Sequence, residues 1–147
     1  MILLLTAKVL LTLNTLGYSL ATILVDLNKT HATNPDWVPH ARFHLVWQVI
    51  CFNMLGALAL LSLWLPGPYA DERIYAAILI AAAVYGSFFV ALLARNSYGG
   101  GMYDRNGYPP FEWKNRSGSA VELDRNTTIF TIQVALLALA TLLVIIA

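Results

Sequence analysis

Hydrophobic side chains gather in four long runs that are separated by three polar stretches. The runs cover about residues 2–25, 43–65, 74–94 and 127–147. Each has the length and composition of a membrane-crossing helix, which needs about 20 mostly apolar residues to span the hydrocarbon core of a bilayer. The pattern therefore predicts an all-α fold: one integral membrane domain, residues 1–147, built as a transmembrane four-helix bundle.

The third polar stretch, residues 95–126, is much longer than the second, residues 66–73. Connections of this length inside a compact domain are uncommon and often serve a function. Its tyrosines, phenylalanine and tryptophan argue against disorder, because disordered segments contain few aromatic residues. We therefore expect a long cap loop between the third and fourth helices, folded over one end of the bundle.

Composition supports the membrane assignment and excludes several other classes of protein. The chain is 59% hydrophobic and 12% charged, whereas soluble domains carry about 25% charged residues. A soluble fold must expose much of its surface to water, so it could not hide so many apolar side chains. The net charge of +1 and the lack of a Lys/Arg cluster exclude a nucleic-acid partner. The single cysteine, Cys51, excludes an internal disulfide.

With four spans, the first and third polar stretches must emerge on the same side of the membrane. Most of the lysine and arginine residues outside the spans lie in these two stretches. The positive-inside rule therefore predicts that both are cytoplasmic. Three Asn-x-Ser/Thr patterns, at residues 28–30, 115–117 and 126–128, lie on that same side, and their glycosylation would require the opposite orientation. We give the charge bias more weight and predict the cytoplasmic orientation for both stretches.

The histidines are confined to the first polar stretch and the start of the second span. They are His31, His40 and His44. Pro39 suits the first turn of a helix, so His40 and His44 should begin the second helix. Their spacing of four residues places them on one helical face, which Gln48 and Cys51 continue toward the membrane.

The first span carries a matching polar stripe in which Asn14, Tyr18, Thr22 and Asp26 recur every four residues. Such a stripe should face protein or a water-filled cavity, because lipid offers no hydrogen-bond partners. In the third span, Tyr85 is the residue expected to bring a hydroxyl into the interior. The stripe ends at the same membrane face as the histidines. We therefore expect the two polar faces to pack together and Asp26 to meet all three histidines.

Three interpretations of this group stay open. In the first, His31, His40 and His44 bind a transition metal, with Asp26 as a further ligand; imidazole suits zinc, copper or iron. In the second, a histidine and Asp26 move protons on a lipid-soluble substrate without a metal. In the third, these side chains only cap helix ends and anchor the loop.

Residues 26–44 read DLNKTHATNPDWVPHARFH. This segment resembles a family of small four-span membrane proteins that share the pattern D-x-N-x-T-H-x-x-N-P-x-W-x-P-H-A-x-F-H. The resemblance implies a four-span fold and carries no activity with it. The chain is also vaguely similar to the emopamil-binding sterol isomerases, which use polar residues inside a small helical bundle, but it lacks their intramembrane glutamates.

Two functional hypotheses follow. In one, the chain is a membrane enzyme that acts on a hydrophobic, lipid-like small molecule in a pocket between the first two spans. Its candidate catalytic residues are Asp26, His31, His40 and His44, and its candidate substrate-binding residues are Arg42, Tyr18, Gln48 and Arg95. In the alternative, the chain is a non-catalytic accessory subunit of a larger membrane complex and packs against a membrane-protein partner.

Overall fold

The computed structural model of the protein describes residues 1–115 and 120–147. Four apolar helical segments of the described chain are long enough to cross a membrane, which is compatible with the predicted multi-pass protein. The helices are α1 (Ile2–Tyr18), α2 (Leu20–Asp26), α3 (Pro39–Trp64), α4 (Arg73–Ala94) and α5 (Arg125–Ile145), with a short 3-10 helix, η1 (Arg95–Ser97), after α4. The second Asn-x-Ser/Thr pattern extends into residues 116–119, which lie outside the described residues.

The first predicted span is broken into α1 and α2 at Ser19, whose backbone leaves helical geometry with φ −100° and ψ −85°. The Ser19 carbonyl at this break has hydrogen-bond partners. The Ser19 carbonyl accepts bonds from the Thr22 N–H at 3.0 Å, the Thr22 hydroxyl at 2.6 Å and the Asn53 side chain of α3 at 3.3 Å. A carbonyl released from a helix inside a membrane needs such partners, because lipid offers none. Polar residues of the first span therefore support a bend.

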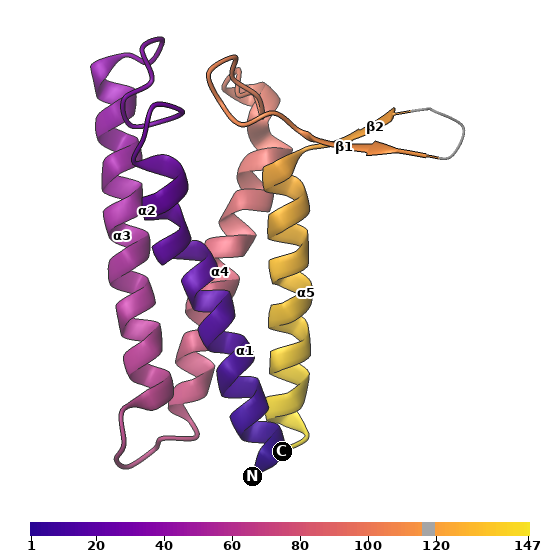
Figure 1. The fold of residues 1–147 in the computed structure, drawn as a ribbon. Helices are drawn as coiled ribbons and strands as arrows, with labels where there is room; N and C mark the ends of the chain where they lie inside the picture. The colour runs from indigo at the N-terminus through magenta and orange to yellow at the C-terminus, as the bar shows by residue number, and fades with distance from the viewer. Residues whose placement is uncertain (116–119) are drawn as a thin grey trace.

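The break divides the bundle into a packed end and an open end. α1 packs along α5 and also contacts α3 and α4, whereas the main neighbour of α2 outside the first span is α3. In Figure 1, α2 and α3 lie together at the upper end, separated from α4 and α5. Both chain termini lie at the lower end, together with the turn between α3 and α4. The two longer connections therefore share the open end, as the topology requires.

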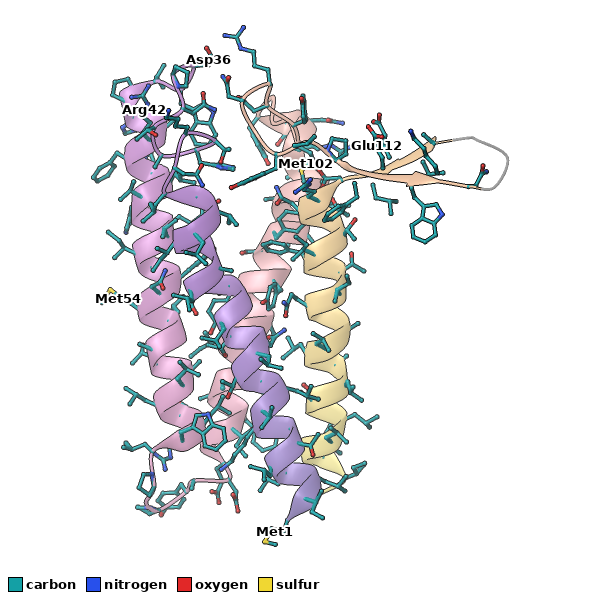
Figure 2. The ribbon with its side chains drawn as sticks, in the orientation of Figure 1. Met1, Asp36, Arg42, Met54, Met102 and Glu112 are labelled. Carbon is teal, nitrogen blue, oxygen red and sulfur yellow. The ribbon has the colours of Figure 1, made fainter. Side chains whose placement is uncertain are left out.

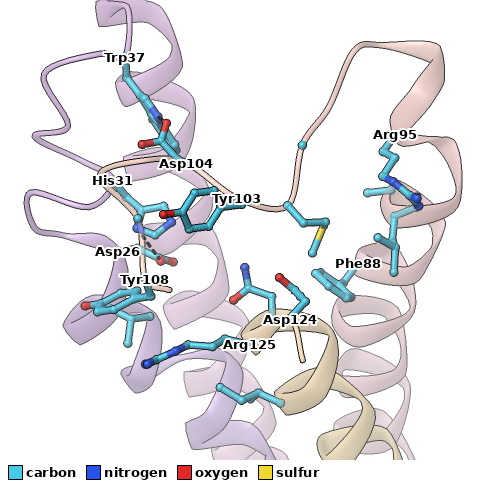
Figure 3. Close-up of a pocket in the computed structure, with 18 of the residues that line it drawn as sticks. Asp26, His31, Trp37, Phe88, Arg95, Tyr103, Asp104, Tyr108, Asp124 and Arg125 are labelled. Carbon is cyan, nitrogen blue, oxygen red and sulfur yellow. Dashed lines mark hydrogen bonds and ion pairs between the residues drawn. The ribbon is translucent and has the colours of Figure 1, made fainter. Parts of the chain in front are cut away.

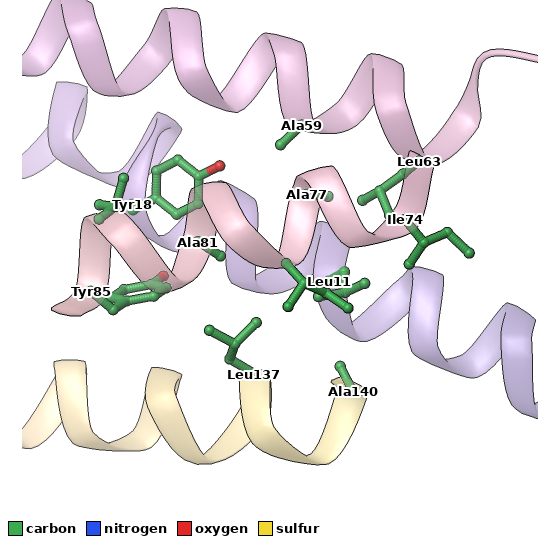
Figure 4. Packing of buried hydrophobic residues seen from close by; sticks show 12 residues of the cluster. Leu11, Tyr18, Ala59, Leu63, Ile74, Ala77, Ala81, Tyr85, Leu137 and Ala140 are labelled. Carbon is green, nitrogen blue, oxygen red and sulfur yellow. The ribbon is translucent and has the colours of Figure 1, made fainter. Parts of the chain in front are cut away.

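The core fills the packed end and is made of small and aliphatic side chains from α1, α3, α4 and α5 (Figure 4). Ala59, Ala77 and Ala140 are fully buried or nearly so, and residues of this size let membrane helices approach closely. Above these residues, hydrogen bonds made by polar side chains join α1 to α4 and α5. The Tyr85 hydroxyl donates to the Asn14 carbonyl at 2.7 Å, and the Asn14 amide donates to Gln133 Oε1 at 2.8 Å.

Two expectations about the spans are confirmed by this packing. Asn14 and Tyr18 of the polar stripe are buried within the protein, and Tyr85 does bring its hydroxyl into the interior. The stripe faces α4 and α5 through Asn14 and Tyr18, however. It does not face the histidine-bearing surface of α3.

The all-α expectation needs one correction, because the third connection contains a two-stranded antiparallel hairpin, β1 (Phe111–Lys114) and β2 (Ala120–Leu123). Phe111 pairs with Leu123 and Trp113 with Val121, so apolar residues share one face of the hairpin. Glu112, on the other face, points away from the helices (Figure 2). The alternation of aromatic and charged residues before the last span is the strand signal that the sequence interpretation missed.

We predict that Gly56→Ala destabilises the bundle by about 1–3 kcal/mol, the usual cost of overpacking a core. A Cβ at Gly56 would lie 2.5 Å from the Ser19 Cβ, so α3 and the break could not keep their present approach. The free energy of unfolding can be measured by titration with a denaturing detergent.

The matched control is Gly86→Ala in α4, where a Cβ would meet no atom within 4 Å. This variant should be neutral or more stable, because alanine is the better helix former. Equal unfolding free energies for the Gly56 and Gly86 variants would contradict the close approach at the break.

Candidate functional site

A cavity of about 670 Å³ lies at the open end of the bundle, between α2 and the ends of α4 and α5 (Figure 3). Pockets that bind small molecules have volumes of about 300–1,000 Å³. No described residue of α3 lines it. The sequence predicted a pocket between the first two spans, and this pocket does not lie there. The break at Ser19 carries α2 toward α3, so the open space lies on the other side of α2.

Asp26 and His31 lie together on one wall of this pocket. His31 Nδ1 is 3.8 Å from Asp26 Oδ1 and 2.7 Å from the Thr30 hydroxyl. Asp26 is the last residue of α2, and a turn over the next residues brings His31 back to it, with the Ala32 N–H donating to the Asp26 carbonyl at 2.9 Å. The structure thus brings together two of the four predicted catalytic residues.

The hydrogen bonds around Thr30 assign the tautomer of His31. The Thr30 hydroxyl has one proton, and it lies 2.7 Å from Asn28 Oδ1 and 3.3 Å from the Val25 carbonyl, which can only accept. The arrangement that satisfies these groups therefore has the hydroxyl accepting a proton from His31 Nδ1 at 2.7 Å. A neutral His31 is therefore protonated on Nδ1, which leaves the Nε2 lone pair free. Within the described part of the chain, no hydrogen bond engages Nε2.

The first and third connections are joined above the pocket by a polar contact that we call the loop clasp: Asn34, Asp36, Asp104, Arg105 and Asn106. Arg105 donates two hydrogen bonds of 2.6 Å to the Asp36 carboxylate, the bidentate geometry that makes arginine–carboxylate pairs strong. Asn106 also donates to Asp36. These bonds hold the pKa of Asp36 below its usual range, mainly through Arg105.

Asp104 is the second carboxylate of the loop clasp and also lines the pocket. It accepts hydrogen bonds from the Asn106 N–H at 2.8 Å, the Asn34 amide at 3.2 Å and the Trp37 indole at 3.3 Å. These donors lower the pKa of Asp104, with the Asn106 N–H contributing most. Trp37 in turn packs edge-on against His31, with ring centroids 5.5 Å apart. The loop clasp therefore helps to position the wall that carries His31.

The expected meeting of all three histidines is wrong. His40 and His44 contact each other, with their Nε2 atoms 3.0 Å apart, but both are exposed on the first turns of α3 and neither lines the pocket. Among the described residues, no group of three or more His, Cys, Asp or Glu side chains is arranged to hold a metal ion. The first connection folds His31 back onto Asp26, whereas α3 turns its histidine face outward.

The four predicted substrate-binding residues also separate. Arg95, at the end of α4, lines the pocket. Tyr18 is buried in the core, where its ring packs edge-on against Tyr85 with centroids 5.7 Å apart. Gln48 is exposed beside His44 in a shallow surface groove. Arg42 is half-buried on α3 and does not line the pocket.

The sequence interpretation missed several pocket residues because they lie far along the chain from Asp26 and His31. Tyr103, Asp104 and Tyr108 belong to the third connection, and Arg125 begins α5. The ion pair between Asp36 and Arg105 joins residues 69 positions apart, and no local pattern indicates such a partner. The expected cap loop gave the only signal, because it placed aromatic residues near this end of the bundle.

We predict that the loop clasp is lost in acid. The pKa values of Asp36 and Asp104 are lower in the folded protein than in an unfolded chain, so the stability that they contribute is fully present above about pH 5 and disappears as the pH falls below about 4. The Trp37 indole N–H signal in an NMR spectrum should move in that range, since this group donates to Asp104.

Asp36→Asn should shift the same signal already at neutral pH, whereas Asp71→Asn, at the opposite end of the bundle, should leave it unchanged. A Trp37 transition centred well above pH 4 would contradict the lowered pKa values.

Comparison with known proteins finds no matching family model, curated protein or solved structure. Functional inference therefore rests on the pocket and on the side chains that line it.

Proposed function

We propose that the chain is a multi-pass membrane protein that binds a lipid-like small molecule in the pocket at its open end and transfers a proton on that molecule through His31. The observation that carries the proposal is the arrangement of His31. Its Nδ1 is held by Thr30 beside Asp26, and no hydrogen bond from the described residues engages its Nε2.

The lining of the pocket suits a molecule with an apolar part and a polar part. Phe88 and Ile129 contribute apolar surface from α4 and α5, and Met102 adds to it from the third connection. Asp26 and His31 line the same pocket at the end of a membrane span. A lipid-like ligand could therefore keep its hydrocarbon among the helices and offer its polar atoms to His31.

Proton transfer by His31 follows a general acid–base scheme. Nε2 takes a proton from the bound molecule, and the resulting imidazolium is stabilised by the Asp26 carboxylate 3.8 Å from Nδ1. The imidazolium then returns a proton to the same molecule at a second atom, which regenerates neutral His31. The net change is a proton shift within the ligand, so atoms and charge balance without a further reactant.

The remaining parts of the proposal concern access and orientation. The third connection acts as the cap of the pocket, and the loop clasp keeps this cap in place through Arg105 and Asp36. We place the first and third connections in the cytoplasm, because they carry most of the positive charge outside the spans.

The proposal is tested by solvent deuterium exchange. Purified protein is incubated in D₂O with a total membrane-lipid extract, and the lipids are examined by mass spectrometry. We expect at least one lipid to gain deuterium at a carbon-bound position, because a base that removes its proton returns deuterium from solvent. His31→Gln and Asp26→Asn should abolish or strongly reduce the gain, by about a hundredfold or more for His31.

The matched control is His44→Gln, which removes an imidazole that lies outside the pocket and should exchange like the wild type. If no lipid gains deuterium with the wild-type protein, or if His31→Gln exchanges as fast, the acid–base role is refuted. The accessory-subunit hypothesis would then be the better account.

A further inference from the structure

The strongest unassigned feature of the pocket is the guanidinium of Arg125. Its Nε is buried and has no hydrogen-bond partner among the described residues. Its guanidinium carbon lies 4.8 Å from the ring centre of Phe111 and 5.8 Å from that of Tyr108. Figure 3 shows the side chain extending from the start of α5 toward Tyr108, below Asp26.

A cation–π contact with aromatic rings positions a guanidinium without using its hydrogen-bond donors. Both ring centres lie within the cation–π range of the guanidinium carbon, and this attraction uses none of the N–H donors. Arg125 is therefore held in position while its donors stay available. No hydrogen bond within the described part of the chain engages this guanidinium. Arg125 lines the pocket, so a ligand there can supply an acceptor to its terminal N–H groups.

The carboxylates of the pocket do not supply that acceptor. Asp26 is beside His31, Asp104 is bonded within the loop clasp, and Asp124 accepts from the Thr127 N–H as the N-cap of α5. In the described ranges, no ion pair reaches Arg125. Arg95, on the opposite wall at the start of η1, donates to the Leu92 carbonyl of α4, and no ion pair within the described residues reaches it. Arg125 and Arg95 thus line the pocket without a carboxylate partner among the described residues.

We propose that the molecule bound in this pocket carries an anionic oxygen head group, a carboxylate or a phosphate, and that Arg125 binds it. The planar donors of arginine match the oxygens of either group. Arg95 adds positive charge across the pocket, and the hydrocarbon of the ligand lies against Phe88 and Ile129. This inference rests on the proposed function, since it specifies the ligand of the same pocket.

The inference is tested by titrating single-chain probes that share a twelve-carbon tail into the protein in maltoside micelles. Dodecanoate and dodecyl phosphate carry the two anionic heads, dodecanol carries a neutral head and dodecyltrimethylammonium a cationic one. Calorimetry gives the dissociation constant of each. We expect at least one anionic probe to bind about tenfold or more tightly than dodecanol, with the dodecanoate and dodecyl phosphate arms distinguishing carboxylate from phosphate.

Arg125→Gln should weaken binding of the preferred anionic probe by about ten- to a hundredfold and leave dodecanol within about twofold. Arg125→Lys keeps the charge without the planar donors and should show a smaller loss, which keeps the test usable if the glutamine variant does not fold. Lys8→Gln removes the same charge from α1, outside the pocket, and should bind every probe like the wild type.

The outcomes separate the two proposals. Binding of all probes without preference for an anionic head, or unchanged binding of the anionic probes by both Arg125 variants, overturns the head-group inference and leaves the pocket as a ligand site. Failure of every probe to bind the wild-type protein overturns the head-group inference and the proposed ligand pocket together.

Discussion

At Ser19 the backbone of the first span leaves helical geometry, and α2 continues beside α3. The carbonyl that this break frees accepts bonds from Thr22 and from Asn53. Each such bond contributes about 0.5–1.5 kcal/mol net in ordinary protein interiors, and leaving the carbonyl unpaired in lipid would cost several kcal/mol. Because Gly56 has no Cβ, which would lie 2.5 Å from the Ser19 Cβ, α3 approaches closely enough for Asn53 to reach this carbonyl.

The break has opposite consequences at the two ends of the bundle. Below it, α1 stays among α3, α4 and α5, and small residues such as Ala59 and Ala77 allow close packing. Above it, α2 follows α3, so the ends of α4 and α5 are left without a helix to cover them. The pocket occupies that space, and the third connection crosses it to reach the first through Arg105 and Asp36. The packed end holds the helices together through apolar contact, whereas the open end depends on polar contacts between connections.

The sequence predicted the parts of this arrangement that are written locally. Runs of about 20 apolar residues identify the spans whatever they pack against, and the helix that begins at Pro39 follows from proline's place in a first turn. The burial of Asn14 and the inward hydroxyl of Tyr85 follow from the lack of hydrogen-bond partners in lipid.

The parts that depend on long-range geometry were not predictable in the same way. The polar residues around Ser19 indicated an interior face but not a break. His40 and His44 share a helical face by spacing, yet spacing does not say which way that face turns, and it turns outward. The pairing of Asp26 with His31 was predicted as part of a larger group, whereas Arg125 entered the pocket only through the position of α5. The pattern of residues identifies a helix, whereas the contacts between helices determine what each face of that helix packs against.

We infer that the break at Ser19 opens a ligand pocket between α2 and the ends of α4 and α5. Native mass spectrometry of the protein purified from membranes tests it most directly, with Ala91→Trp, which fills the pocket, compared with Ala82→Trp on an exposed face of the same helix. We expect a bound small molecule of defined mass on the wild-type and Ala82→Trp proteins that is absent from Ala91→Trp. The same adduct on all three proteins, or none on the wild type, would contradict this inference.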